Sequence, residues 1–189
     1  AVEIAMKMAL QSQAQRGQTQ RTQFASFANG YHGETTGTMS VGDYDIAISP
    51  FKSMLFPATL IGNLPYRSGP DDPLWQDASN QWPAIESQLD EVKNNLAAIL
   101  YEPIMQGAGS MKLYSPDLLA RLRTWAKANN VYLIADEIAA GMGRCGGMLA
   151  SHLTKSQADS TDLVLPDFAV LSKGITGGVL PLSLVLTTD

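Results

Sequence analysis

Two carboxylates and one lysine each come just after a short apolar run in this sequence. They are Glu102, Asp136 and Lys173. In open α/β sheets, ligands bind beyond the carboxyl ends of the strands. If the apolar runs are parallel strands, the three side chains converge on one edge of a sheet, where a base, an acid and an amine could act on one ligand.

Each of these residues also has a plain structural interpretation. The carboxylates could be helix caps or ion-pair partners, and Lys173 could be a surface charge in a glycine-rich turn. The flanks of Lys173 favour chemistry, because Gly174, Gly177 and Gly178 follow it closely. Glycines let the backbone approach a bulky ligand, and a lysine held in such a place can act as a nucleophile on an aldehyde.

Pyridoxal phosphate is the cofactor that such a lysine fits. The cofactor also needs an acid that keeps its pyridine nitrogen protonated, for which Asp136 is the candidate. Tyr31, beside His32 and Gly33, is available to stack on the ring. The plain alternatives for Tyr31 and His32 are a half-buried aromatic ring and a hydrogen-bonded histidine. Because the chain has two histidines and one cysteine, no metal site is expected.

The elements that must position these residues alternate between helix and strand. We expect helices at residues 2–16, from Ile85 through Val92 and Leu96, and from the Ser115 cap to Asn129; strands at 24–28, 96–101, 131–135, 168–171 and 182–186; and a long irregular segment at 43–80. This alternation implies crossover connections and a mostly parallel sheet. Continuous apolar strands indicate that both faces are covered. The predicted fold class is therefore α/β with three layers.

Composition excludes several classes of protein. The chain has 189 residues, 45% of them hydrophobic, and a net charge of −5. Without a Lys/Arg cluster, neither a nucleic-acid nor a membrane partner is expected. The apolar runs are too short to span a membrane. The single cysteine, Cys145, predicts a cytoplasmic protein. The sequence begins inside an amphipathic pattern and stops just after an apolar run, so we expect an incomplete domain.

Six short motifs, taken in order, resemble one family. They are AVEIAMK at 1–7, YHG at 31–33, EPIMQG at 102–107, LIADEI at 133–138, GMGR at 141–144 and SKGITGG at 172–178. Over essentially its whole length the sequence resembles the class III (fold-type I) pyridoxal-phosphate aminotransferases. The resemblance implies that residues 1–189 are the cofactor-binding large domain, with an N-terminal segment and a C-terminal small domain missing.

The resemblance implies catalytic roles for three residues. Lys173 would form a Schiff base with the cofactor and later move the proton between the substrate Cα and the cofactor. Asp136 would pair with the pyridine nitrogen. Glu102 would lie close to the Schiff base and tune the charge near the cofactor and the incoming amine.

The resemblance also implies binding roles around the ring. Tyr31 would stack on one face of the ring and also meet the substrate, and Ile138 would pack on the other face. His32 and Gly33 would belong to the cofactor site with Tyr31. Arg144 corresponds to a family arginine on the substrate side.

The family also implies parts beyond this chain. The Gly-Ser turn that holds the cofactor phosphate would precede Ala1, and the arginine for the substrate carboxylate would lie in the small domain. A partner subunit would supply a phosphate-binding threonine, so a homodimer is expected. Two features depart from the family: Glu34 replaces the usual aspartate, and residues 155–166 are longer and more polar than usual.

Within the family, residues 31–41, 106–111 and 181–188 are most similar to the biotin-synthesis branch. That branch implies 8-amino-7-oxononanoate as the keto acceptor and S-adenosylmethionine or lysine as the small-molecule amino donor. Three alternatives stay open: another class III aminotransferase acting on an ω-amino acid, ornithine or a diamine; a non-catalytic homologue; and a nucleotide-binding α/β domain. The last is disfavoured, because no Gly-rich phosphate loop follows a strand.

Overall fold

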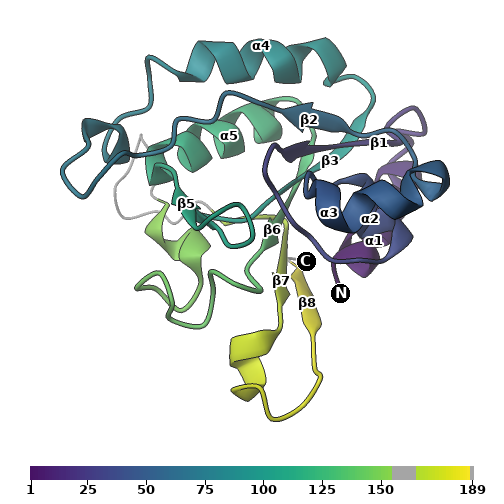
Figure 1. Cartoon of the computed structure of the whole chain (residues 1–189). Helices are drawn as coiled ribbons and strands as arrows, with labels where there is room; N and C mark the ends of the chain where they lie inside the picture. Colours follow the sequence, from purple (N-terminus) through teal and green to yellow (C-terminus); the bar gives the residue numbers. More distant parts are fainter. Residues whose placement is uncertain (155–164, 188–189) are drawn as a thin grey trace.

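A six-stranded sheet forms the centre of the molecule (Figure 1), which is a computed structural model that describes residues 1–154 and 165–187. Its strands are β1 (Gln23–Phe27), β2 (Thr59–Ile61), β3 (Leu96–Tyr101), β6 (Tyr132–Asp136), β7 (Phe168–Leu171) and β8 (Leu184–Thr187), in the spatial order β2-β1-β3-β6-β7-β8. Neighbouring strands run parallel except β7 and β8, which are antiparallel. The predicted α/β fold with a mostly parallel sheet is confirmed.

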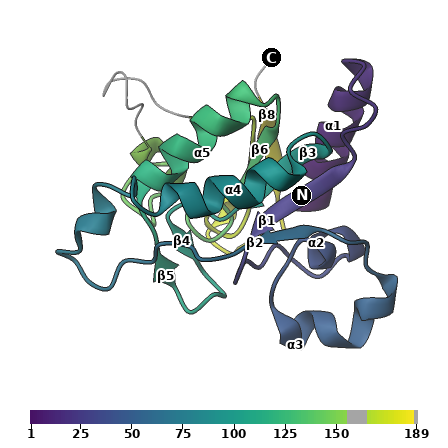
Figure 2. The same cartoon turned by 90° about the horizontal axis from the view of Figure 1, so that it is seen from above.

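Helices cover both faces of this sheet. The α-helices are α1 (Val2–Gln15), α2 (Thr36–Ser40), α3 (Asp45–Ile48), α4 (Trp82–Val92) and α5 (Pro116–Ala128). Figure 2 shows α4 and α5 lying together over the sheet, away from α1. Because successive side chains of a strand point to opposite faces, Ile99 and Leu133 join the core cluster with α4 and α5. Leu100 and Ile134 join the cluster with α1.

A local sequence signal explains the start of α5. Before α5, the Ser115 hydroxyl oxygen accepts a hydrogen bond from the backbone N–H of Asp117 at 2.9 Å, with Pro116 at the first helical position. This is the expected cap. The helix predicted to run through Leu96 ends at Val92, and Leu96 is the first residue of β3.

The segment at 43–80 was predicted to be irregular, and that prediction was wrong in part. It contains α3, β2 and the 3-10 helices η1 (Ser49–Met54) and η2 (Pro73–Trp75). β2 extends the edge of the sheet, where Ile61 pairs with Phe27 and is fully buried. A strand of three residues is too short to show a hydrophobic period, so only its pairing with β1 identifies it.

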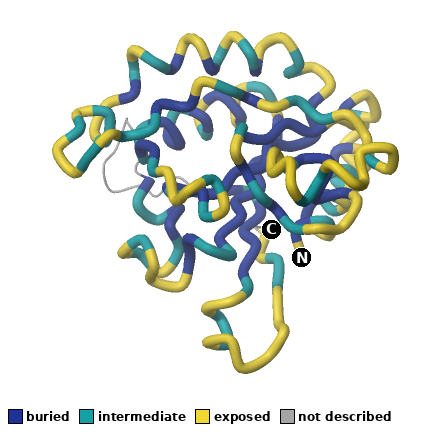
Figure 3. Tube along the Cα trace, viewed as in Figure 1, coloured by how far each residue is buried: buried dark blue, intermediate teal, exposed yellow. Residues whose placement is uncertain are grey.

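The chain leaves the sheet after β7 in a projecting hairpin (Figure 1). η4 (Lys173–Thr176) follows β7, and the chain then returns as β8, two residues later than predicted. Figure 3 shows buried strands in the centre and an exposed hairpin tip, where Val179 is 81% exposed.

Two further predictions concern membrane-spanning helices and the segment at 155–166. Among residues 1–154 and 165–187, no helix is long and apolar enough to cross a membrane. Most of the long polar segment expected at 155–166 lies outside the described residues.

The position of Leu133 between β6 and the α4–α5 layer leads to a stability prediction. Its side chain is 1% exposed within the core cluster. Leu133→Ala should lower the free energy of unfolding by about 2–5 kcal/mol, because it leaves a cavity in a packed layer. Val179 at the hairpin tip is 81% exposed, so Val179→Ala should change the free energy by no more than about 0.5 kcal/mol. Urea denaturation measures both, and equal losses would contradict this assignment of the core.

Candidate active site

The expected convergence of polar side chains occurs at the carboxyl end of the sheet. Glu102 follows β3, Asp136 is the last residue of β6, and Lys173 comes shortly after β7. These three strands are neighbours and parallel, so their ends meet at one edge. A cavity of about 820 Å³ opens there, lined by Tyr31, His32, Gly33, Glu102, Met105, Gly107, Ala108, Met111, Asp136, Ile138, Ala139, Arg144 and Lys173. All eight residues predicted for the site from the sequence line this one cavity.

A buried pair of Asp136 and His32 forms the floor of the site. Nδ1 of His32 donates a hydrogen bond to Oδ2 of Asp136 at 2.9 Å, and both side chains are nearly inaccessible. The other carboxylate oxygen, Oδ1, accepts the backbone N–H of Ile138 at 3.1 Å. Nε2 of His32 is buried and has no hydrogen-bond partner among the described residues. The pair therefore fixes the direction of the carboxylate.

Glu102 holds two loops together at the same edge. Its Oε1 accepts the backbone N–H of Tyr31 at 3.1 Å, and its Oε2 accepts the backbone N–H of Gly107 at 2.8 Å. Burial raises the pKa of the Glu102 carboxyl, and the nearby imidazole of His32 and the two N–H groups partly oppose that shift. Glu102 thus ties the exit of β1 to the hairpin that follows β3, and it reaches the cavity from that position.

Tyr31 forms one side wall. Its ring meets Tyr44 edge-on, with centroids 5.9 Å apart at an interplanar angle of 84°, and its hydroxyl donates to Glu34 at 3.1 Å. Burial and the hydrogen bond to Glu34 raise the pKa of the Tyr31 phenol. Gly33 has a φ of +115°, which requires glycine at this turn. The ring is held at its edge and at its hydroxyl, which leaves a face for a flat ligand.

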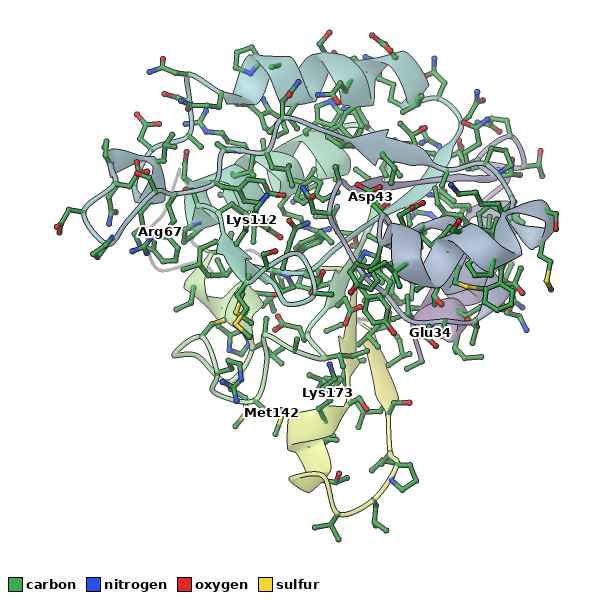
Figure 4. The ribbon with its side chains drawn as sticks, in the orientation of Figure 1. Glu34, Asp43, Arg67, Lys112, Met142 and Lys173 are labelled. Carbon is green, nitrogen blue, oxygen red and sulfur yellow. The ribbon has the colours of Figure 1, made fainter. Side chains whose placement is uncertain are left out.

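Lys173 occupies an unusual backbone conformation at the opening of the cavity. Its φ is +45°, in the left-handed region that non-glycine residues rarely adopt. Within residues 1–154 and 165–187, no ion pair of its amine is found. A Cβ on Gly174 would lie 2.8 Å from Cβ of Met142. Figure 4 shows Lys173 and Met142 near each other where β7 gives way to the hairpin. The glycine is required by this close approach.

Some parts of the cavity could not be identified from the sequence alone. The hairpin of β4 (Met105–Gln106) and β5 (Lys112–Leu113) contributes Met105, Ala108 and Met111 to the wall. Ala139 adds a fourth apolar side chain from the loop after β6. These residues carry no chemical signal of their own. Met105 lies in the motif at 102–107, and Ala108 and Met111 lie in the run at 106–111, but Ala139 lies in neither.

The arrangement can bind a flat, polar ligand and act on it with an amine. Asp136 supplies a fixed negative charge at the floor, Tyr31 and Ile138 supply walls, and Lys173 and Arg144 supply cations at the rim. The charge of Asp136 favours a ligand that carries a protonated nitrogen facing it. The amine of Lys173, once deprotonated, can attack an electrophilic group of the same ligand.

Two solved structures share the fold of this chain. The structure of an amine transaminase from an uncultivated Pseudomonas species in its PLP-bound form has a TM-score of 0.84 and 34% identity, covering 100% of this chain and 41% of that one. The structure of adenosylmethionine-8-amino-7-oxononanoate aminotransferase from Methanocaldococcus jannaschii has a TM-score of 0.82 and 33% identity, covering 100% of this chain and 39% of that one.

Sequence comparisons also find aminotransferases among the relatives of this chain. The chain is 38% identical to the adenosylmethionine-8-amino-7-oxononanoate aminotransferase of Helicobacter pylori, covering 98% of this chain and 39% of that protein. It is 37% identical to that of Synechococcus elongatus, covering 100% of this chain and 42% of that protein. The chain thus spans about two fifths of the length of these relatives. The family model described as aminotransferase class-III matches residues 1–189. The chain belongs to the class III aminotransferase family.

Proposed function

We propose that the protein carrying this chain is a pyridoxal-phosphate-dependent aminotransferase that transfers an amino group to 8-amino-7-oxononanoate in biotin synthesis. The single observation that carries the proposal is the meeting of Lys173, Asp136, Glu102 and Tyr31 in one cavity. The names of the relatives support the choice of acceptor. S-adenosylmethionine and lysine are the candidate donors.

The residues of the cavity fit pyridoxal phosphate. A buried carboxylate at the floor matches the ring nitrogen, and the fixed His32–Asp136 pair keeps that carboxylate from turning away. A residue larger than glycine at position 107 would press on Ala139, because its Cβ would lie 3.2 Å from the Ala139 Cβ. The small residues therefore leave room for a flat ring beside Glu102. When bound, the cofactor supplies an electron sink for the negative charge that develops on the substrate carbon.

Each residue would then have a distinct task. Asp136 would hold a proton at the ring nitrogen, because a buried carboxylate stabilises the charged form of its partner. Lys173 would bind the cofactor through Nζ, and the same nitrogen would move the proton at the substrate Cα. Tyr31 and Ile138 would hold the two ring faces. Arg144, which is exposed at the rim, would lie on the substrate side and donate hydrogen bonds to a polar group of the substrate.

The proposal includes a homodimer. Large apolar side chains lie exposed on α3 and η1, with Ile46 80%, Met54 61% and Phe51 45% accessible. Contiguous exposed apolar surface marks interaction sites on soluble proteins. A second copy that covers this surface would remove the side chains from water.

A half-reaction screen of the full-length protein tests the proposed function. The absorbance of the bound cofactor is followed with S-adenosylmethionine, lysine, ornithine or 4-aminobutyrate as donor, and with 8-amino-7-oxononanoate as acceptor. We expect turnover with 8-amino-7-oxononanoate and with S-adenosylmethionine or lysine. A response to ornithine or 4-aminobutyrate without turnover of 8-amino-7-oxononanoate would move the protein to another branch. No response to any of these compounds would favour the alternative that the protein is a non-catalytic homologue.

Asp136→Asn tests the role of the buried carboxylate. The substitution keeps the shape of the side chain but removes the charge that faces His32 and would face the ring nitrogen. We expect the variant to retain some cofactor and to lose turnover by about 100-fold or more, as preorganised charge in an active site is worth that much. Asp71 is exposed on a distant loop, so Asp71→Asn is the matched control. Near-parental turnover of Asp136→Asn would refute the assigned role.

A further inference from the structure

Glu137 is a buried carboxylate that the proposed chemistry does not use. Its side chain is 0% exposed, although its neighbour Asp136 faces the cavity. Successive residues at a strand end point in opposite directions, so Glu137 is directed away from the cavity and does not line it. None of the ion pairs among the described residues involves it. A buried charge needs several hydrogen bonds to be tolerated.

Three donors satisfy this carboxylate, and all come from one short segment. Oε2 accepts the backbone N–H of Ala150 at 2.8 Å. Oε1 accepts both the backbone N–H of Ser151 at 2.8 Å and its hydroxyl at 2.5 Å. These donors begin the 3-10 helix η3 (Ala150–Leu153). One side chain therefore joins the end of β6 to the start of η3 and closes the intervening loop at its base.

The closed loop, residues 138–149, has little regular structure of its own. Met142, Gly143 and Gly146 have φ values of +55°, +88° and +103°. The loop packs directly on Glu137: the N–H of Gly141 donates to the Glu137 carbonyl oxygen at 2.8 Å. A Cβ on Gly141 would lie only 2.7 Å from that oxygen and 3.2 Å from Oε2. The carboxylate and the backbone of one residue thus hold both the base and the turn of the loop.

The loop carries functional side chains of the cavity. Ile138 and Arg144 line the cavity from this loop, and Met142 contacts Gly174 beside Lys173. We propose that Glu137 is a positioning residue that locks residues 138–149 and so sets where Arg144 meets the substrate. The hydrogen bonds alone support the part of the proposal in which Glu137 holds the loop. The consequence for substrate binding rests on the proposed function.

A glutamate suits position 137 better than a glutamine. A carboxylate offers two acceptor oxygens to three donors, whereas the glutamine amide would turn an N–H₂ group toward a donor. Leaving one buried donor unsatisfied favours opening of the loop. Cys145, next to Arg144, is partly buried and packs against the core cluster. Its thiol therefore reports whether the loop is open.

The test uses the full-length protein and three variants. Glu137→Gln breaks the lock, and Ser151→Ala removes only the hydroxyl donor, which keeps the test valid if the first variant folds poorly. Glu91→Gln makes the same chemical change at an exposed position on α4. Two quantities are measured: the rate of Cys145 alkylation by iodoacetamide, read from the mass of its peptide, and the KM and kcat for 8-amino-7-oxononanoate.

We expect Glu137→Gln to speed Cys145 alkylation by about tenfold, the factor that corresponds to one unsatisfied buried donor. Ser151→Ala should give a smaller increase, and Glu91→Gln none. For Glu137→Gln we also expect KM to rise by about tenfold with a smaller change in kcat, since a displaced arginine loses a charged hydrogen bond in binding.

Two results would overturn the proposal. Parental alkylation rates in both Glu137→Gln and Ser151→Ala would show that the carboxylate does not lock the loop. Faster alkylation with parental KM would show that the loop does not position the substrate. If the parent protein has no aminotransferase activity, the proposed function and the substrate half of this proposal fall together, while alkylation still decides the lock.

Discussion

The parallel alignment of β1, β3, β6 and β7 is the constraint on which the site depends. These strands are consecutive neighbours, so each delivers the residues after its carboxyl end to the same edge. This shared edge brings together four residues from separate parts of the sequence: Tyr31, Glu102, Asp136 and Lys173. The helices on both faces hold the strands in this order through two buried clusters. The packing that holds the strands in the core therefore also sets the geometry of the site.

Three buried carboxylates at this edge are stabilised in three ways. Asp136 is paired with His32, Glu102 binds the backbone N–H groups of two loops, and Glu137 binds the start of a 3-10 helix. Burying a carboxylate is unfavourable unless such partners are present. In each case the partners belong to a different segment of the chain. The requirement to satisfy the charges thereby fixes the loops around the cavity, and the loops then position the walls and the rim.

Much of this arrangement could be predicted from the sequence, for a physical reason. Buried parallel strands leave continuous apolar runs, so the ends that carry Glu102, Asp136 and Lys173 can be located without an alignment. The loops could not be predicted in this way. Ile104, Ser110, Met142 and Lys173 all adopt positive φ values although none is a glycine. Tertiary contacts impose such conformations, and residue type gives no sign of them. β2 was missed because three residues show no period, and Glu137 because its partners are distant loop N–H groups.

Reductive trapping shows directly whether Lys173 holds the cofactor. Full-length protein loaded with pyridoxal phosphate is treated with borohydride, digested, and analysed by peptide mass. We expect the visible absorption band to disappear and the added mass to lie on the peptide containing Lys173. Lys173→Ala should show neither the band nor the added mass. Trapping on a different lysine, or a band that persists in Lys173→Ala, would contradict the account.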